Sequence, residues 1–440
     1  MVTHDVETPL LLDPRPLSAT SPEAETGRDE RPLSVAYLSP GWPPEAFANG
    51  VIPCIAAVAD ELRRRGHRAS ILSLRTVGGG GEDVHDLSRA GASSALPRRL
   101  LDGLARRLPY RVARTLRPHQ SLDALPRFVA EHGAQILEME EAFGWASWAR
   151  RKVGIPVVVR LHGPWFLNGP LQGAPDDDTF RRRVREEGES IRTADGVTAP
   201  SQDVLERTRA YYGLELEGAA VIPNPMPPVS AERRWRPEGC DPGLVLFVGR
   251  FDRHKGGDLM IDAFAEVARE FPGVRLCFVG PDFGASGGDG VRWGLVDYVR
   301  DRIPGALESG RVEWLGQQPS TAVAELRRRA RVTVVCSRYE TFGLTATEAM
   351  AHGCPLVATR AGALPEVVRD GVAGLLCRPD DPSDLARAIG RLLADPDLAA
   401  RLGARAAEEC GKRYHPAVIA GQLMEYYEEV ITRRRERVEA

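Results

Sequence analysis

The chain has 440 residues, of which 43% are apolar, so it is long enough to fill two hydrophobic cores. Its 58 basic and 61 acidic residues leave a formal net charge of -3, which excludes the global basic footprint of a nucleic-acid-binding protein and favours a small-molecule partner. The seven cysteines are odd in number and scattered, without a C-x-x-C pair. They predict reduced, mostly buried thiols and argue against a disulfide framework or a zinc site.

Residues 1–32 predict a disordered tail, because they are rich in proline and polar residues and carry a single short apolar run, Leu10–Leu12. No apolar run approaches the roughly 18 to 20 residues that span a bilayer. The N-terminus also lacks the basic segment and apolar core of a secretory signal. We therefore expect a cytoplasmic protein.

The first predicted domain covers residues 33–225. It starts with a short apolar strand, Val35–Leu38, followed by a helical pattern from Val51 to Arg65 that Gly66 ends. Further strand patterns alternate with helical ones, at 69–74, 135–137, 156–161 and 196–199. This alternation predicts an α/β domain whose parallel sheet is covered on both faces.

A proline-dense segment, residues 226–242, predicts a linker. Residues 243–412 then repeat the alternation, with strand patterns at 244–249, 274–280, 311–315, 332–336 and 355–358. The sequence thus predicts two Rossmann-like, doubly wound parallel-sheet domains with a cleft between them. Residues 413–440 are amphipathic and predict a helix that returns to the first domain.

The most specific motif follows the strand pattern that ends at Cys336. It reads S-R-Y-E-T-F-G-L-T-A-T-E-A-M-A from Ser337 to Ala351, with seven residues between Glu340 and Glu348. A strand-loop-helix turn at the carboxyl end of a parallel sheet directs free backbone N–H groups outward, where a diphosphate fits. The motif resembles the E-x7-E signature of the retaining glycosyltransferases of family 4, which have the GT-B fold. The alternative is a pair of glutamates on a solvated helix face.

The resemblance implies a separate role for each part of this motif. Glu340 reaches the transferred sugar, and Glu348 accepts hydrogen bonds from the ribose hydroxyls. The backbone amides at the start of the helix bind the diphosphate; they belong to Gly343, Leu344 and Thr345.

Two further segments resemble motifs of the same family. Residues 247–256 read F-V-G-R-F-D-R-H-K-G, like the family's G-R-x-x-x-x-K-G motif, which implies that Arg250 and Lys255 hold the diphosphate and neutralise charge on the leaving nucleotide. Residues 160–164 read R-L-H-G-P, like the family's H-G turn, which implies that His162 lies near the reacting centre. The alternatives are an ordinary polar turn and a structural histidine.

Asn49 and Gly50 stand where the family has a Gly-Gly pair at the start of the first helix, and only the second glycine is matched. We expect this loop to let the backbone approach the diphosphate and the acceptor. Asp282 follows a strand pattern, and Val312 opens a V-E-W-L-G segment that resembles the one passing the nucleobase, so both are expected in the donor site. Trp314 is expected in the core, with stacking on the base as the alternative.

The resemblance covers residues 34–435 and implies transfer of a sugar from a nucleotide-diphosphate donor to an acceptor hydroxyl, with retention of anomeric configuration and without a metal or other cofactor. A UDP-sugar is favoured over a GDP- or ADP-sugar, and the acceptor is a small molecule, a glycan or a lipid-linked compound. The alternatives are a non-catalytic nucleotide-sugar-binding protein, a GT-B nucleotide-sugar epimerase and a phosphorylase. A dehydrogenase is disfavoured, because no strand pattern is followed by G-x-G-x-x-G.

One stretch of the first domain is strongly basic. Residues 97–118 carry seven arginines, from Arg98 to Arg117, against a single acid, Asp102. They predict contact with an anionic membrane surface or an anionic acceptor, or else a solvated basic helix. The arginine-, alanine- and proline-rich composition suggests a bacterial protein.

Overall fold

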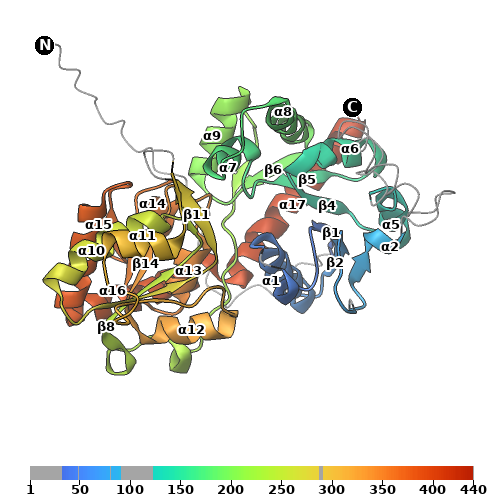
Figure 1. Ribbon diagram of the computed structural model, residues 1–440. Helices are drawn as coiled ribbons and strands as arrows, with labels where there is room; N and C mark the ends of the chain where they lie inside the picture. Colours follow the sequence, from blue (N-terminus) through green and yellow to red (C-terminus); the bar gives the residue numbers. More distant parts are fainter. Residues whose placement is uncertain (1–31, 48, 80, 91–121, 287–290, 440) are drawn as a thin grey trace, which may run out of the picture. The chain divides into compact units, whose positions relative to one another are not determined.

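The structure is a computed structural model that describes residues 32–47, 49–79, 81–90, 122–286 and 291–439 (Figure 1). Residues 33 to 440 form one compact unit. The predicted tail up to residue 31 and the whole arginine-rich stretch, with its predicted membrane or acceptor contact, lie outside the described residues.

The first domain is built on a seven-stranded parallel sheet in the order β3-β2-β1-β4-β5-β6-β7. Every residue of the central strand β1 is buried, which explains its continuous apolar run. The strand order reverses between β1 and β4, so the loops that follow these two strands leave the sheet next to each other. The strands are β1 (Ser34–Ser39), β2 (Arg68–Ser73), β3 (Val84–Asp86), β4 (Ile136–Glu140), β5 (Val157–Arg160), β6 (Gly196–Ala199) and β7 (Ala220–Val221).

Helices cover both faces of this sheet. Side chains from α5, α6, α8 and α9 fill the core on one face, and side chains from α1 fill the core on the other. The helices of this domain are α1 (Val51–Arg64), α2 (Leu87–Ala90), α5 (Leu125–His132), α6 (Trp145–Lys152), α7 (Trp165–Leu171), α8 (Asp178–Thr193) and α9 (Gln202–Tyr212).

The last helix, α17 (Pro416–Glu439), packs on the first sheet beside α1. Figure 1 shows this red helix among the blue and green elements of the first domain. Its buried residues recur every three or four positions, as expected for one apolar face of a helix. The Tyr427 hydroxyl donates a hydrogen bond of 2.6 Å to buried Glu138 on β4, and the Tyr426 hydroxyl donates one of 2.9 Å to the Val197 carbonyl on β6.

The second domain is built on a six-stranded parallel sheet in the order β13-β10-β8-β14-β15-β16. When only the strands of this sheet are counted, its order is 3-2-1-4-5-6, the same as that of the first six strands of the first sheet, and the reversal falls between β8 and β14. β8 begins at Asp241, so the last two residues of the segment predicted as a linker belong to a strand. The strands are β8 (Asp241–Val248), β10 (Arg275–Val279), β13 (Val312–Trp314), β14 (Ala330–Val335), β15 (Leu356–Thr359) and β16 (Leu375–Cys377).

One face of the second sheet is covered by α10, α11 and α15, and the other by α13 and α16. A small three-stranded sheet that the sequence did not predict has the order β12-β11-β9. Its strands are β9 (Phe251–Asp252), β11 (Asp282–Ser286) and β12 (Arg292–Trp293). The helices of this domain are α10 (Gly257–Glu270), α11 (Leu295–Arg302), α12 (Ser320–Arg329), α13 (Leu344–Ala351), α14 (Leu364–Val367), α15 (Pro382–Ala394) and α16 (Pro396–Tyr414).

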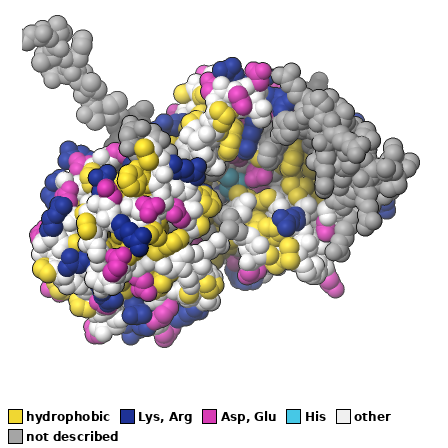
Figure 2. Space-filling model, viewed as in Figure 1, with side chains coloured by type: hydrophobic (Ala, Val, Ile, Leu, Met, Phe, Trp, Pro, Cys, Tyr) yellow, Lys and Arg dark blue, Asp and Glu magenta, His cyan; other side chains and the backbone are white. Residues whose placement is uncertain are grey.

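The mixed charges of the surface and the free, mostly buried cysteines agree with the expectations from the composition. All seven cysteines are free thiols, and all except half-buried Cys240 are buried. On the face shown in Figure 2, basic and acidic side chains are interspersed over the second domain. Within the described ranges, no helix combines the length and the apolar content needed to cross a bilayer.

Candidate active site

The centre of the candidate site lies at the strand reversal of the second sheet. β8 and β14 are parallel neighbours, so the loop after β8, which carries Lys255, meets the loop after β14, which carries Glu340. Lys255 Nζ lies 2.6 Å from Glu340 Oε1, and Ser337 Oγ donates to the same oxygen at 2.7 Å. The structure therefore brings two predicted site residues together and adds Ser337, which the motif contained without a role.

Glu340 is held as a carboxylate. Its side chain is 11% exposed, and burial by itself raises a carboxyl pKa. The Lys255 ammonium and the hydrogen bonds from Lys255 and Ser337 outweigh that burial, and the pKa of Glu340 is lowered below its usual value. A fixed negative charge therefore stands at the carboxyl end of the sheet at neutral pH.

Arg250 is oriented by two residues that the sequence did not single out. Its Nε lies 2.6 Å from Asp252 Oδ2, and its guanidinium carbon lies 5.4 Å from the centre of the Phe283 ring. The other oxygen of Asp252 accepts a hydrogen bond of 2.6 Å from the Lys255 amide. One carboxylate thus fixes both ends of the G-R-x-x-x-x-K-G segment.

The start of α13 has the backbone geometry expected of an anion site. Gly343 precedes this helix with a φ of 96°, a left-handed conformation that glycine adopts without strain. Leu344 and Thr345 are the first two residues of the helix, so their amides have no acceptor within it. The free N–H groups and the positive end of the helix dipole favour a bound diphosphate here.

Glu348 lies on the second turn of α13, and its side chain is 44% exposed. Its Oε2 accepts a hydrogen bond of 2.6 Å from Arg327 of α12, whose side chain is only 4% exposed. Buried Arg327 therefore fixes the orientation of Glu348, the residue predicted to bind the ribose. The sequence contained no signal for this partner, because Arg327 is one of three consecutive arginines.

In the first domain, the His162 turn is held by Glu141. Glu141 is 4% exposed, and its carboxylate accepts hydrogen bonds from the amides of His162 (3.0 Å) and Gly163 (2.8 Å). Burial, with a smaller contribution from the Arg160 guanidinium, lowers the pKa of His162 to about 3. The imidazole is therefore neutral at pH 7 and offers a ligand hydrogen bonds but no charge.

The loops of the first domain approach the α13 region. A Cβ atom built on Gly163 would lie 3.8 Å from Thr341 Cγ2, and one built on Gly50 would lie 2.5 Å from Leu344 Cδ1. Gly50 has an ordinary φ of -70°, so glycine matters here because Leu344 comes close. Asn49 uses its Oδ1 to accept a hydrogen bond of 2.8 Å from the Val51 amide, at the start of α1.

Two residues expected in the donor site, Asp282 and Val312, make structural contacts. Both carboxylate oxygens of Asp282 accept backbone hydrogen bonds, from Gly284 (2.9 Å) and Leu295 (2.8 Å), which order the small sheet and start α11. Val312 is 2% exposed in the core, and its amide donates to the Ala306 carbonyl.

The prediction that Trp314 lies in the core is wrong. The residue is 37% exposed, because β13 is an edge strand. Its Nε1 donates a hydrogen bond of 2.9 Å to the Gly280 carbonyl.

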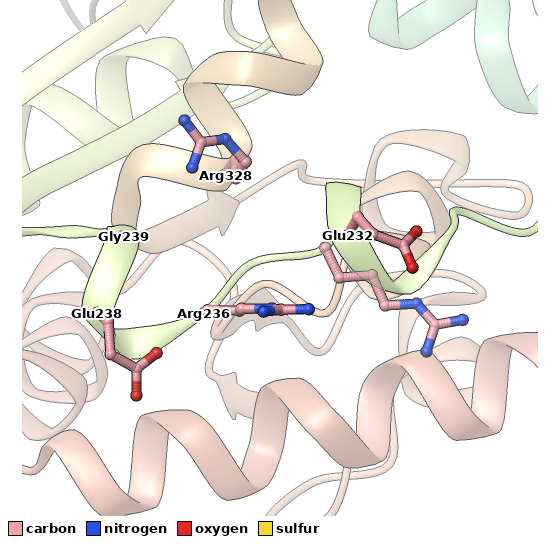
Figure 3. Close-up of a pocket in the computed structure, with 6 residues that line it drawn as sticks. Glu232, Arg236, Glu238, Gly239 and Arg328 are labelled. Carbon is pink, nitrogen blue, oxygen red and sulfur yellow. The ribbon is translucent and has the colours of Figure 1, made fainter.

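A cavity of about 580 Å³ lies on the linker, apart from these residues (Figure 3). It contains none of the predicted donor ligands, and its arginines are bonded locally, Arg234 to the Val229 carbonyl and Arg328 to Glu325. This cavity is therefore not the candidate donor site. Its lining residues are Glu232, Arg234, Arg236, Glu238, Gly239 and Arg328.

Comparison with known proteins agrees with this geometry. The family model for "Glycosyltransferase Family 4" matches residues 48–228, and the model for "Glycosyl transferases group 1" matches residues 231–409. D-inositol 3-phosphate glycosyltransferase of Thermobifida fusca is 32% identical over 298 residues, which are 64% of this chain and 67% of that protein. The chain belongs to the group 1 glycosyltransferases of family 4. This membership confirms the predicted family.

Further matches show how much of this chain the likeness covers. D-inositol 3-phosphate glycosyltransferase of Nocardiopsis dassonvillei is 33% identical over 274 residues, 59% of this chain and 62% of the relative, so the alignments span about three fifths to two thirds of these curated relatives. The structure of Anabaena Alr3699/HepE in complex with UDP-glucose matches with a TM-score of 0.62 at 20% identity, covering 90% of this chain and 100% of that one. This likeness confirms the GT-B fold. The names of the relatives favour transfer over the epimerase and non-catalytic alternatives.

Proposed function

We propose that this glycosyltransferase moves a sugar from a UDP-sugar to an acceptor hydroxyl, with retention of anomeric configuration and without a bound metal. The observation that carries the proposal is the Lys255–Glu340 pair at the strand reversal, where the His162–Gly163 turn approaches Thr341. The Anabaena neighbour, solved with UDP-glucose, supports the donor class. The relatives named D-inositol 3-phosphate glycosyltransferase make a cyclitol phosphate the first acceptor to test.

The donor is bound mainly by the second domain. The diphosphate oxygens accept hydrogen bonds from the amides of Leu344 and Thr345 and from the Lys255 ammonium, with Arg250 beside them. Glu348, fixed by Arg327, accepts hydrogen bonds from the ribose hydroxyls. Glu340 and neutral His162 bind hydroxyls of the transferred sugar.

Transfer takes place on one face of the sugar. The bond between the anomeric carbon and the phosphate oxygen breaks, the acceptor oxygen forms a bond to the same face, and the acceptor proton passes to the departing phosphate oxygen. Lys255, Arg250 and the start of α13 stabilise the negative charge that develops on the leaving UDP. This step requires no covalent bond to a side chain, because the acceptor oxygen itself attacks the anomeric carbon.

The first experiment is a thermal-shift screen of UDP-, GDP-, ADP- and dTDP-sugars against the wild type, Glu348→Gln and the exposed control Glu238→Gln. A ligand that binds only the folded state raises the melting temperature. A shift with the UDP-sugar that Glu348→Gln reduces and Glu238→Gln preserves supports the donor site. A shift with a different nucleotide, or with none, contradicts the proposed donor.

The second experiment follows product formation from the UDP-sugar with D-inositol 3-phosphate and myo-inositol as acceptors, with and without EDTA. Proton NMR of the product reads the anomeric configuration. Retention and full activity in EDTA are expected. An inverted product contradicts the same-face mechanism, and loss of activity in EDTA contradicts metal independence.

A further inference from the structure

The start of α9, in the first domain, is capped by a residue of the second domain. Glu366 Oε2 accepts a hydrogen bond of 2.8 Å from the Gln202 amide, and Glu366 Oε1 accepts one of 2.8 Å from the Asp203 amide. These amides are among those that a helix leaves without internal acceptors, and a negative charge is favoured at this end of a helix. A single carboxylate therefore satisfies two amides of the other domain.

Two more hydrogen bonds join the same end of α9 to the residues that flank Glu340. The Ser201 hydroxyl donates to the Thr341 carbonyl at 2.8 Å, and the Tyr339 hydroxyl donates to Asp203 Oδ2 at 2.8 Å. Ser201 is 2% exposed and Tyr339 is 7% exposed, so the donor residue of each bond is shielded from water. The residues on both sides of Glu340 are thus tied to the first domain.

Glu366 lies in α14, and the turn just before this helix, Gly362–Ala363, touches Glu340 itself. The Ala363 amide donates a hydrogen bond of 2.8 Å to the Glu340 carbonyl. Gly362 has a φ of 54°, and a Cβ atom at this position would lie 2.3 Å from the same carbonyl oxygen. Because this turn lies directly on the backbone of Glu340, a movement of Glu366 is transmitted to the proposed sugar ligand.

We propose that Glu366 is a positioning residue that caps α9 and thereby holds the Tyr339–Thr341 segment, with Glu340, against the first domain. Glu366 acts through the backbone of Glu340 and does not itself contact the substrate. The inference rests on the proposed role of Glu340 in sugar transfer. It assigns a function to Glu366 of α14 and the turn before it, which neither the donor site nor the mechanism uses.

The variant that tests the proposal is Glu366→Gln. A glutamine side chain keeps one acceptor oxygen but sets an NH2 group against the second amide, so the bidentate cap is lost with little change in volume. Glu238→Gln is the matched control. Glu238 is exposed on the linker, and its substitution removes the same charge without removing a cap of α9. Ser201→Ala removes the neighbouring bond to Thr341, together with the 3.3 Å hydrogen bond that Ser201 Oγ accepts from the Val204 amide.

The first measurement is hydrogen exchange of the Gln202 and Asp203 amides without any substrate. Exchange at these amides is expected to be at least about 10-fold faster in Glu366→Gln than in the wild type and in Glu238→Gln, since an amide exchanges when its hydrogen bond opens. Equal exchange in all three proteins would show that the cap is absent in solution and would overturn the proposal.

The second measurement is steady-state transfer. If Glu366 positions the loop, the kcat of Glu366→Gln falls at least about 10-fold while the KM for the donor stays within about three-fold, because fewer molecules hold the competent arrangement. Ser201→Ala lowers kcat in the same way, and the double variant loses less than the product of the two effects. A kcat within two-fold of the control, or a loss confined to donor KM, overturns the positioning role. Absence of transfer in the wild type would contradict the proposed function, and hydrogen exchange would still decide the cap.

Discussion

Lys255 Nζ lies 2.6 Å from Glu340 Oε1, although the two residues are 85 positions apart in the chain. The contact exists because β8 and β14 are neighbours in the sheet while their following loops carry opposite charges. Glu340 is nearly buried, so its charge depends on Lys255 for compensation. The pair therefore serves the stability of the fold as well as the proposed chemistry.

Lys255→Met is expected to lower transfer by at least about 100-fold, because a cation that stabilises the leaving diphosphate is lost. It is also expected to lower the free energy of unfolding by about 1 to 3 kcal/mol, because Glu340 keeps only Ser337 as a partner. Initial rates and urea unfolding measure the two effects, and exposed Lys412→Met is the control. Transfer within three-fold of the control would contradict the assignment of Lys255.

The low pKa of His162, about 3, predicts a pH effect on stability. Between that value and the unfolded value of about 6.5, the unfolded chain binds a proton that the folded protein does not. The free energy of unfolding therefore falls as the pH falls through this window, by up to about 1 kcal/mol per pH unit from His162. His162→Gln is expected to show a shallower decrease between pH 6 and pH 4 than the wild type in urea unfolding. Parallel curves would show that His162 titrates normally.

Glu141→Gln tests whether transfer depends on the hydrogen bonds from the His162 and Gly163 amides to Glu141. The glutamine accepts one of the two amide hydrogen bonds and leaves the other amide facing an NH2 group. We expect kcat to fall about 10- to 100-fold, since a small displacement of a site group is costly. Glu189→Gln, an exposed charge on α8, is the control in the transfer assay. Equal rates for the two variants would remove Glu141 from the site.

Gly343→Ala and Gly50→Ala are expected to differ in stability. At Gly343 the φ of 96° is unfavourable for alanine, and the new Cβ would lie 2.8 Å from Leu364 Cδ2. We expect a loss of about 1 to 2 kcal/mol in the free energy of unfolding. At Gly50 the new Cβ meets only the end of the Leu344 side chain, so the loss stays under about 1 kcal/mol.

The Gly50 variant still has a consequence for binding. Leu344 has to turn away, which disturbs the first turn of α13, where the diphosphate is proposed to bind. The donor thermal shift is therefore expected to decrease in Gly50→Ala and to recover in the double variant Gly50→Ala, Leu344→Ala. A decrease that the second substitution does not relieve would point to another cause.

The α/β alternation was readable in the sequence because buried parallel strands are continuous apolar runs, as in β1 and β14. Short strands gave no such signal: β9 and β12 have two residues each. The error at Trp314 has a related origin, since an aromatic residue in a strand predicts burial only if the strand lies inside the sheet. Strand order is a tertiary property, and nothing local placed β13 at the edge.

For the candidate site, the motif residues Glu340, Lys255 and Arg250 were predicted, and the structure brings the first two into contact. Their supporting partners were not. Glu141 is 21 positions from His162, and Glu366 is about 160 positions from the amides it caps. The fold brings such partners together, and the sequence around a glutamate does not indicate which amide it will bind.

The hydrogen bond between Tyr427 and Glu138 joins residues 289 positions apart, across the whole second domain. Because ribosomes synthesise proteins from the N-terminus, Glu138 is made nearly three hundred residues before Tyr427. Until α17 packs against it, the β4 face that this helix covers remains open, and Glu138 lacks the hydroxyl of Tyr427. The domain that is synthesised first is therefore completed last, and the second domain can fold while the first still awaits its final helix.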